Sequence, residues 1–265
     1  MRLCSIASGS SGNCIYVGSE ATHLLVDTGI SGKRIEAGLN ELELAGRDID
    51  GILITHEHSD HISGLGVIAR KYGIPIYGTA GTLNALKNCK SLGAIDTDLF
   101  IEIKEDNRFT IKDLQINPMH ISHDAAQPCG YRFAYGNTKV AVCTDLGTYN
   151  DYTVECLKDM DALFLEANHD VNMLQVGPYP YHLKQRILGD RGHLSNENSG
   201  RLLCRVLHDN LKHIFLGHLS NENNIPELAF EAVRLEINMG DNPYKAGDFH
   251  MEVAKRHEIS PVIAL

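Results

Sequence analysis

The sequence predicts one α/β domain that spans residues 1–265. Segments with the patterns of strands and of helices alternate along the whole chain, and no change of composition marks a linker. A chain of 265 residues is slightly longer than the usual upper size of one hydrophobic core, so one large domain is favoured over two small ones. With 43% hydrophobic and 22% charged residues, the composition is globular and can fill that core.

The first 50 residues begin with β-structure and continue with a helix. Short runs at residues 3–7, 14–18 and 23–27 are separated by turns rich in glycine and serine, so each run is predicted to be a strand. Between residues 31 and 44, apolar side chains recur at three- and four-residue spacing. This spacing predicts a helix that starts at a capping serine and ends before Gly46.

The remaining elements alternate in the same way. Residues 51–55 form a near-continuous apolar run, which is typical of a strand buried on both faces. Helices are predicted at 62–72, 81–87, 201–207 and 226–237, and strands at 74–78, 140–144, 162–166 and 213–217, with β-rich sequence over 99–142.

The composition narrows the class of protein. Acidic residues outnumber basic ones by 34 to 24, and the net charge of −10 argues against a protein that coats nucleic acid through a general positive field. The seven cysteines are scattered without a CxxC pair, so neither a disulfide framework nor a zinc ribbon is expected. No run approaches the roughly 20 apolar residues that cross a bilayer, and no secretory segment is evident, so we expect a cytoplasmic protein without a membrane partner.

The clearest chemical signal is a histidine-rich turn at residues 56–61, directly after the buried run. It places four candidate metal ligands within six residues, namely His56, His58, Asp60 and His61. Imidazole and carboxylate are the ligands that zinc and similar divalent ions prefer, and ligands on one rigid turn need little ordering. The alternative is a solvated histidine-rich loop, which the buried strand before the turn disfavours. The turn therefore predicts a metal site.

Further candidate ligands follow other predicted strands. His123, Asp145 and His218 each come after an apolar run, and Asp27 ends the third predicted strand. Because strand ends on one edge of a sheet converge, we expect these side chains to lie close to the histidine-rich turn. For Asp27 taken alone, a local Asx turn is an equally good interpretation.

The order HxHxDH, His, Asp, His resembles the metallo-β-lactamase fold superfamily over essentially the whole chain. The resemblance implies a four-layer αββα sandwich and a hydrolase that binds two divalent metal ions, zinc or manganese. It implies that Asp145 bridges the two ions and that Asp27 supports the ligand turn. It also implies a first metal site of His56, His58 and His123, and a second of Asp60, His61 and His218.

The third histidine of this pattern has two candidates, since His120 and His123 lie three residues apart. His123 stands seven residues before Gly130, which is the spacing of a ligand histidine in related nucleases. His123 is therefore the preferred ligand, and His120 is expected to pack or to support the site.

Two more residues resemble the catalytic pair of ribonuclease Z-like phosphodiesterases. Glu166 ends a predicted strand, and His193 lies in a Gly-His-Leu-Ser segment. The resemblance implies that His193 gives a proton to the leaving oxygen, that Glu166 orients His193, and that Asp60 helps to orient the metal-held hydroxide that attacks. The plain alternatives are a surface carboxylate at a strand end and a histidine near a helix cap.

Dispersed segments narrow the resemblance to the YycJ/WalJ-like branch of this superfamily. They include ASGSSGN at residues 7–13, TDLG at 144–147 and EANHD at 166–170. That branch implies a 5′→3′ exonuclease that acts on DNA, as a single strand or at a duplex end. The alternatives are hydrolysis of a small ester, thioester or cyclic phosphodiester on the same site, which the acidic charge favours, and a non-catalytic metal-stabilised binding protein. Assembly into a homo-oligomer and the role of His169 stay open.

Three further features of the sequence each allow two interpretations. A locally basic stretch at residues 181–215, with two tyrosines beside it, suits contact with a nucleic acid strand or is an ordinary solvated helix face. The Gly/Ser turn at 8–13 either offers N–H groups to a phosphate or is a tight hairpin turn. The segment GHLSNEN occurs at 192–198 and again at 217–223, where it either caps two helices or delivers two histidines to one site.

Overall fold

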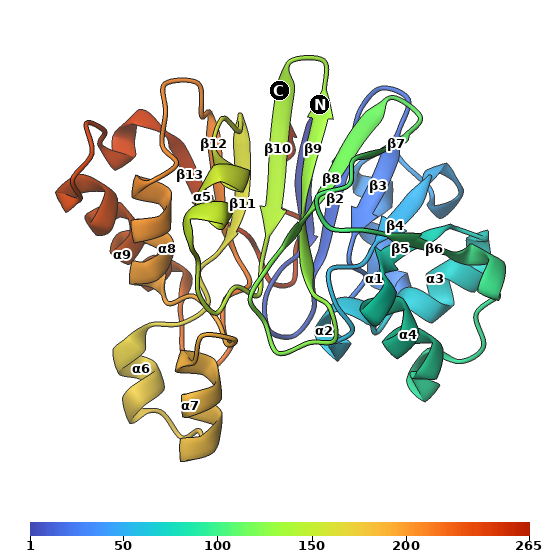
Figure 1. Ribbon diagram of the computed structural model, residues 1–265, viewed down its shortest axis with the longest axis horizontal. Helices are drawn as coiled ribbons and strands as arrows, with labels where there is room; N and C mark the ends of the chain where they lie inside the picture. Colours follow the sequence, from blue (N-terminus) through green and yellow to red (C-terminus); the bar gives the residue numbers. More distant parts are fainter.

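The computed structural model describes residues 1–265 and contains two seven-stranded sheets with helices on both outer faces (Figure 1). In hydrogen-bonded order, the first sheet holds β14 (Ile263–Ala264), β1 (Arg2–Ala7), β2 (Cys14–Gly18), β3 (His23–Val26), β4 (Gly51–Leu53), β5 (Ile76–Thr79) and β6 (Phe100–Ile103). The second holds β13 (His250–Val253), β12 (His213–Gly217), β11 (Ala162–Glu166), β10 (Thr138–Cys143), β9 (Cys129–Tyr135), β8 (Leu114–His120) and β7 (Phe109–Ile111). This is the αββα sandwich that the resemblance implied.

The helices divide between the two outer layers (Figure 1). Beside the first sheet lie α1 (Gly32–Glu41), α2 (Ser59–Ile62), α3 (Leu65–Tyr72) and α4 (Ala80–Asn88). Beside the second lie α5 (Asp151–Leu157), α8 (Asn196–Cys204) and α9 (Pro226–Met239), while α6 (Val171–Val176) and α7 (Tyr181–Leu188) project beyond the sheet.

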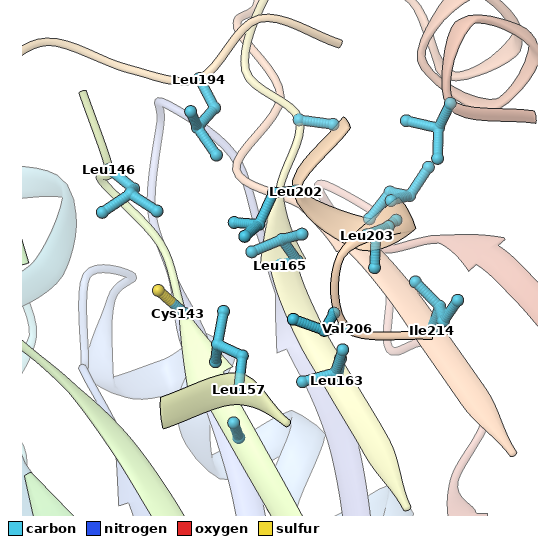
Figure 2. Close-up of a cluster of buried hydrophobic side chains, with 14 of the residues drawn as sticks. Cys143, Leu146, Leu157, Leu163, Leu165, Leu194, Leu202, Leu203, Val206 and Ile214 are labelled. Atoms are coloured by element: carbon cyan, nitrogen blue, oxygen red, sulfur yellow. The ribbon is translucent and has the colours of Figure 1, made fainter. Parts of the chain in front are cut away.

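Three clusters of buried apolar side chains fill the spaces between the four layers. One joins α1, α3 and α4 to the first sheet, one lies between the two sheets, and one joins the second sheet to α5, α8 and α9. Figure 2 shows part of the last cluster, in which Leu163 and Leu165 of β11 meet Leu202 and Leu203 of α8. Each sheet is therefore covered on both faces, which explains the near-continuous apolar runs in the sequence.

Successive side chains of strand β10 belong to two different apolar clusters. Ala141 and Cys143 belong to the cluster under the helices, whereas Val140 and Val142 belong to the cluster between the sheets. Successive side chains of a strand point to opposite faces, so one apolar run supplies both interfaces.

Several predicted boundaries are wrong. The helix predicted at 62–72 corresponds to α3, which begins only at Leu65; before it, α2 ends at Ile62 and the N–H of Gly64 donates to the carbonyl of Thr28 at 2.8 Å. The first helix ends at Glu41 instead of about residue 44, since Glu43 adopts a left-handed φ of 61°. Helix α8 begins at Asn196 rather than 201, and α5, α6, α7 and β13 were not predicted.

The topology brings several strand ends to one edge of the molecule. Strands β3 to β6 are parallel in the first sheet, and β10 to β13 are parallel in the second. Strand β8 also runs parallel to β10, because both are antiparallel to β9 between them. Chain segments that follow β3, β4, β8, β10, β11 and β12 therefore meet where the two sheets face each other.

Candidate metal centre

The histidine-rich turn lies where β4 meets the other strand ends. Helix α2 begins at Ser59, so Asp60 and His61 belong to its first turn while His56 and His58 precede it. His56 and His61 are fully buried. The change from extended to helical backbone directs four side chains of one short segment toward a common centre.

The ring nitrogens of His56, His58 and His123 converge. Nε2 of His56 lies 3.0 Å from Nδ1 of His58, and Nε2 of His123 lies 3.2 Å from the same Nδ1 atom. One ligand atom from each residue lies within 4.8 Å of the others, so this group could hold a metal ion. The structure thus brings together the three residues of the first predicted metal site.

The residues of the second predicted metal site also meet. Oδ2 of Asp60 lies 3.5 Å from Nε2 of His61 and 3.6 Å from Nε2 of His218. The rings of His61 and His218 are stacked with their centroids 5.3 Å apart. These three residues form another group that could hold a metal ion.

Asp145 lies between the two groups. Its Oδ1 is 3.7 Å from Nε2 of His123, and its Oδ2 is 3.2 Å from Nε2 of His61 and 3.0 Å from Nδ1 of His218. Burial alone raises the pKa of Asp145, but the surrounding histidines, above all His218, outweigh burial and hold this pKa well below its usual value. A carboxylate with one oxygen toward each group has the arrangement that the bridging role requires.

The donor set fits divalent cations. Oδ2 of Asp145 and Nδ1 of His218 are buried and lie 3.0 Å apart, but they are not aligned for a hydrogen bond and neither has another partner, although buried polar atoms are nearly always paired. Neutral imidazole and carboxylate together form the usual ligand set of zinc and related ions. A cation in contact with these atoms would satisfy them.

Asp27 fixes the orientation of the His61 ring through its Nδ1 atom. Its Oδ2 lies 2.7 Å from Nδ1 of His61, and its Oδ1 accepts the N–H of Thr55 at 2.8 Å. Nε2 of His61 is therefore left to face the cluster, as expected for a ligand whose other nitrogen is fixed by a carboxylate. Asp27, Asp145 and His218 all adopt left-handed φ values, of 60°, 59° and 55°, directly after strands. Such backbone occurs where the surrounding structure enforces it, often at functional sites.

The Gly/Ser turn at residues 8–13 supports the cluster instead of offering a phosphate site. Five of its six N–H groups, those of residues 8, 9, 10, 12 and 13, donate within the protein. Oγ of Ser8 accepts the N–H of His218 at 2.8 Å, and Nδ2 of Asn13 lies 3.3 Å from Nε2 of His61. The tight-turn interpretation is correct, and these supporting roles of Ser8 and Asn13 were missed from the sequence.

His123 is fixed by the loop after α7. Its Nδ1 lies 3.0 Å from the carbonyl oxygen of Gly192, and Nε and Nη2 of Arg191 donate to its own carbonyl oxygen at 3.2 and 3.1 Å.

His120 was expected to pack or to support the site, and this expectation is wrong. Its side chain is 60% exposed, and its Nδ1 lies 3.3 Å from Oε1 of Glu105. His120 is the last residue of β8 and belongs to none of the candidate ligand groups.

His193 and Glu166 form a pair beside the cluster. Nδ1 of His193 lies 2.7 Å from Oε1 of Glu166, which is fully buried at the end of β11. Burial by itself lowers the pKa of His193, but the Glu166 carboxylate outweighs burial and raises this pKa to about 9. Nδ1 of His193 also lies 3.6 Å from Oδ1 of Asp145. Glu166 is thus no surface residue, and the pair could also take part in metal binding with Asp145 and His218.

The two GHLSNEN segments each place a histidine at the candidate metal cluster. The rings of His193 and His218 lie 5.4 Å apart, so each copy delivers one histidine to the cluster. The N–H of Asn198 donates to Ser195 at the start of α8, and the N–H of Asn223 donates to Ser220 in the same way. Only the first copy caps a helix, because α9 begins later, at Pro226.

The cations of the basic stretch are largely used inside the protein. Lys184 donates to the carbonyls of Gln175 and Gly177, and Arg191 donates to that of His123. The other four cations pair with carboxylates: Arg186 with Asp124, Arg201 with Glu236, Arg205 with Asp151, and Lys212 with Asp161. This stretch therefore presents no row of unpaired cations.

His169, whose role the sequence left open, is 1% exposed, and its Nε2 has no hydrogen-bond partner.

An αββα sandwich with a histidine and aspartate cluster where its sheets meet defines a metal-dependent hydrolase class. The chain belongs to the metallo-beta-lactamase superfamily, whose family model matches residues 7–176. It is 46% identical over 224 residues to exodeoxyribonuclease YycJ of Bacillus anthracis, a match that covers 84% of each chain. It is likewise 46% identical to exodeoxyribonuclease WalJ of Streptococcus pneumoniae, over 84% of this chain and 83% of that one.

Solved structures of distant sequence share the fold. Zn²⁺-bound PqqB from Methylobacterium extorquens superposes with a TM-score of 0.74 at 15% identity over the whole of both chains. The metallo-beta-lactamase fold protein YhfI from Bacillus subtilis gives a TM-score of 0.71 at 18% identity over 98% of both. No helix of the present chain has the length and apolar character needed to cross a lipid bilayer.

Proposed function

We propose that the protein is a metal-dependent phosphodiesterase that degrades DNA as a 5′→3′ exonuclease. The observation that carries the proposal is the His193–Glu166 pair beside a cluster of seven metal-ligand candidates. The 46% identity to proteins named exodeoxyribonuclease supports DNA as the substrate class.

Seven residues would hold two ions, zinc or manganese, with Asp145 between them. When bound, the ions would polarise the scissile phosphodiester and make water a nucleophile at neutral pH. The two groups around Asp145 are His56, His58 and His123 on one side and Asp60, His61 and His218 on the other.

The chain's own residues divide the remaining work. The side chain of Asp60 is 23% exposed, and its carboxylate orients the attacking water. The oxygen of this water forms a bond to phosphorus and releases a proton to solvent, while the bond from phosphorus to the leaving oxygen breaks and His193 donates a proton to that leaving oxygen. Glu166 fixes Nδ1 of His193, so Nε2 is the atom that faces the leaving group.

Hydrolysis of a small ester, thioester or cyclic phosphodiester is a second candidate function. Two observations favour it: the net charge of −10 and the internal pairing of the cations in the basic stretch. Both reduce the general attraction between the protein and a polyanion.

A time course on DNA labelled at the 5′ or the 3′ end, single-stranded and duplex, with added manganese or zinc, separates the two candidates. Early release of the 5′-terminal nucleotide, followed by stepwise shortening, is expected. Intact DNA alongside turnover of bis(4-nitrophenyl) phosphate or a thioester would assign the enzyme to small substrates instead.

A further inference from the structure

A cavity of about 280 Å³ is lined in part by His123. Its walls come from Glu105 after β6, from the end of β8, from the segment 121–128 and from Arg191 in the loop after α7. Since His123 lines this cavity and also belongs to the candidate metal site, the cavity adjoins that site.

Part of the lining combines a flat ring with small apolar groups, beside the polar side chains of Glu105, Ser122 and Gln127. The exposed imidazole of His120 lines it, together with Ala125, Ala126 and Pro128. The backbone N–H of His120 donates to Tyr152, so the position of the residue is fixed while its ring stays accessible. A ring beside small apolar side chains suits a planar base with apolar faces.

Arg191 supplies a cation to the wall of the cavity. Nε and Nη2 donate to the carbonyl oxygen of His123, and Nη1 has no hydrogen-bond partner in the protein. A guanidinium held in place by two hydrogen bonds, with a third nitrogen unused, suits a phosphate oxygen. The other arginines of the basic stretch are paired with carboxylates, so Arg191 differs from them.

We propose that this cavity binds the nucleotide next to the scissile phosphodiester, with its base against His120 and its phosphate against Nη1 of Arg191. The inference rests on the proposed function, because it assigns the cavity to the DNA substrate of the same site. It gives exposed His120, which has no contact with the metal cluster, a role in substrate positioning.

His120→Ala tests the proposal, with His250→Ala as a matched control. His250 is 64% exposed and lies 3.8 Å from Glu252, much as His120 is 60% exposed and lies 3.3 Å from Glu105. His250 begins β13, at the edge opposite the cluster. The KM for single-stranded DNA should rise about fivefold or more in His120→Ala, which corresponds to the low end of the free energy of stacking one base on one ring. In the control, the KM should stay unchanged.

The nucleobase contact is tested by an oligonucleotide with an abasic residue next to the cleaved bond. The unaltered enzyme should show a higher KM for the abasic strand than for the normal one, whereas His120→Ala should show equal values. A second variant, Ala126→Trp, fills the cavity from an exposed position and should raise the KM for DNA as well.

Bis(4-nitrophenyl) phosphate is too short to contact the metal cluster and the cavity at the same time. Its turnover by His120→Ala, His250→Ala and Ala126→Trp should therefore stay within twofold of that by the unaltered enzyme. DNA cleavage with the same KM in His120→Ala, Ala126→Trp and the unaltered enzyme would overturn the cavity proposal and leave the nuclease function intact. No cleavage of DNA by the unaltered enzyme would instead overturn the proposed function itself.

Discussion

Nδ1 of His193 lies 2.7 Å from Oε1 of Glu166. The other oxygen of this buried carboxylate accepts the N–H groups of Leu146 and Leu194, at 2.8 and 3.1 Å. The protein body thus fixes the carboxylate, and the carboxylate fixes the imidazole. This chain of contacts leaves Nε2 of His193 as the atom available to a substrate.

Glu166→Gln should lower the kcat for DNA roughly 10- to 100-fold, as loss of an orienting carboxylate commonly does. The amide keeps the size of the side chain but turns an N–H group toward other donors, so His193 loses its fixed orientation. Metal content, measured by atomic emission on the purified variant, should equal that of the unaltered protein. A variant that loses metal would show instead that Glu166 is itself a ligand.

Asp27→Asn should weaken metal binding about 10- to 100-fold, because the amide holds His61 less firmly than the carboxylate does. Asparagine tolerates the left-handed φ of 60° at this position, so the backbone is kept. Competition with a chromophoric chelator measures the affinity. Asp113→Asn is the control, since Asp113 also accepts hydrogen bonds, from Ser19 and Thr22, but lies between β7 and β8. Equal affinities in the two variants would contradict the role of Asp27.

Adding zinc or manganese to metal-free protein should raise its Tm. A ligand at 100 times its Kd stabilises the folded state by about 2.7 kcal/mol, provided that it does not bind the unfolded chain. Asp145→Asn should abolish most of this rise, because Asp145 lies between the two ligand groups. Differential scanning calorimetry with and without chelator gives both values, and an unchanged rise in Asp145→Asn would refute the bridging position.

Asp113 gives a pH-dependent contribution to stability that is independent of the metal cluster. The hydroxyls of Ser19 and Thr22 donate to its carboxylate and lower its pKa. An unfolded aspartate has a pKa of about 3.9, so this stabilisation is complete above that pH and disappears as pH falls through the lower folded value. Urea unfolding should show a larger loss of stability in Asp113→Asn at pH 7 than at pH 3. Equal losses at both pH values would contradict this assignment.

Much of the site could be predicted because its residues are marked by local sequence. The turn at 56–61 brings four candidate ligands together by itself, and Asp145 and His218 follow apolar runs whose carboxyl ends share an edge. The packing of the sheets on helices follows from the same runs. Periodicity and strand direction therefore suffice to place these residues near one another.

Other features depend on contacts between distant segments and carry no local signal. The cations of residues 181–215 look free in the sequence, but the pairing of Arg186 with Asp124 joins positions 62 residues apart. The spacing to Gly130 favoured His123 over His120 as the ligand, but only the structure shows that His120, at the end of β8, is exposed to solvent. Helix α6 has six residues and α7 has eight, too few to produce a clear periodic pattern.

The most direct test of the central claim, that His193 is a proton donor and not a metal ligand, compares two substrates in His193→Ala. The account predicts unchanged metal content and a fall in DNA cleavage of roughly 10²- to 10⁴-fold. It predicts near-normal hydrolysis of bis(4-nitrophenyl) phosphate, since 4-nitrophenolate leaves without a proton. An equal loss of activity on both substrates, together with loss of metal, would contradict the account and place His193 among the ligands.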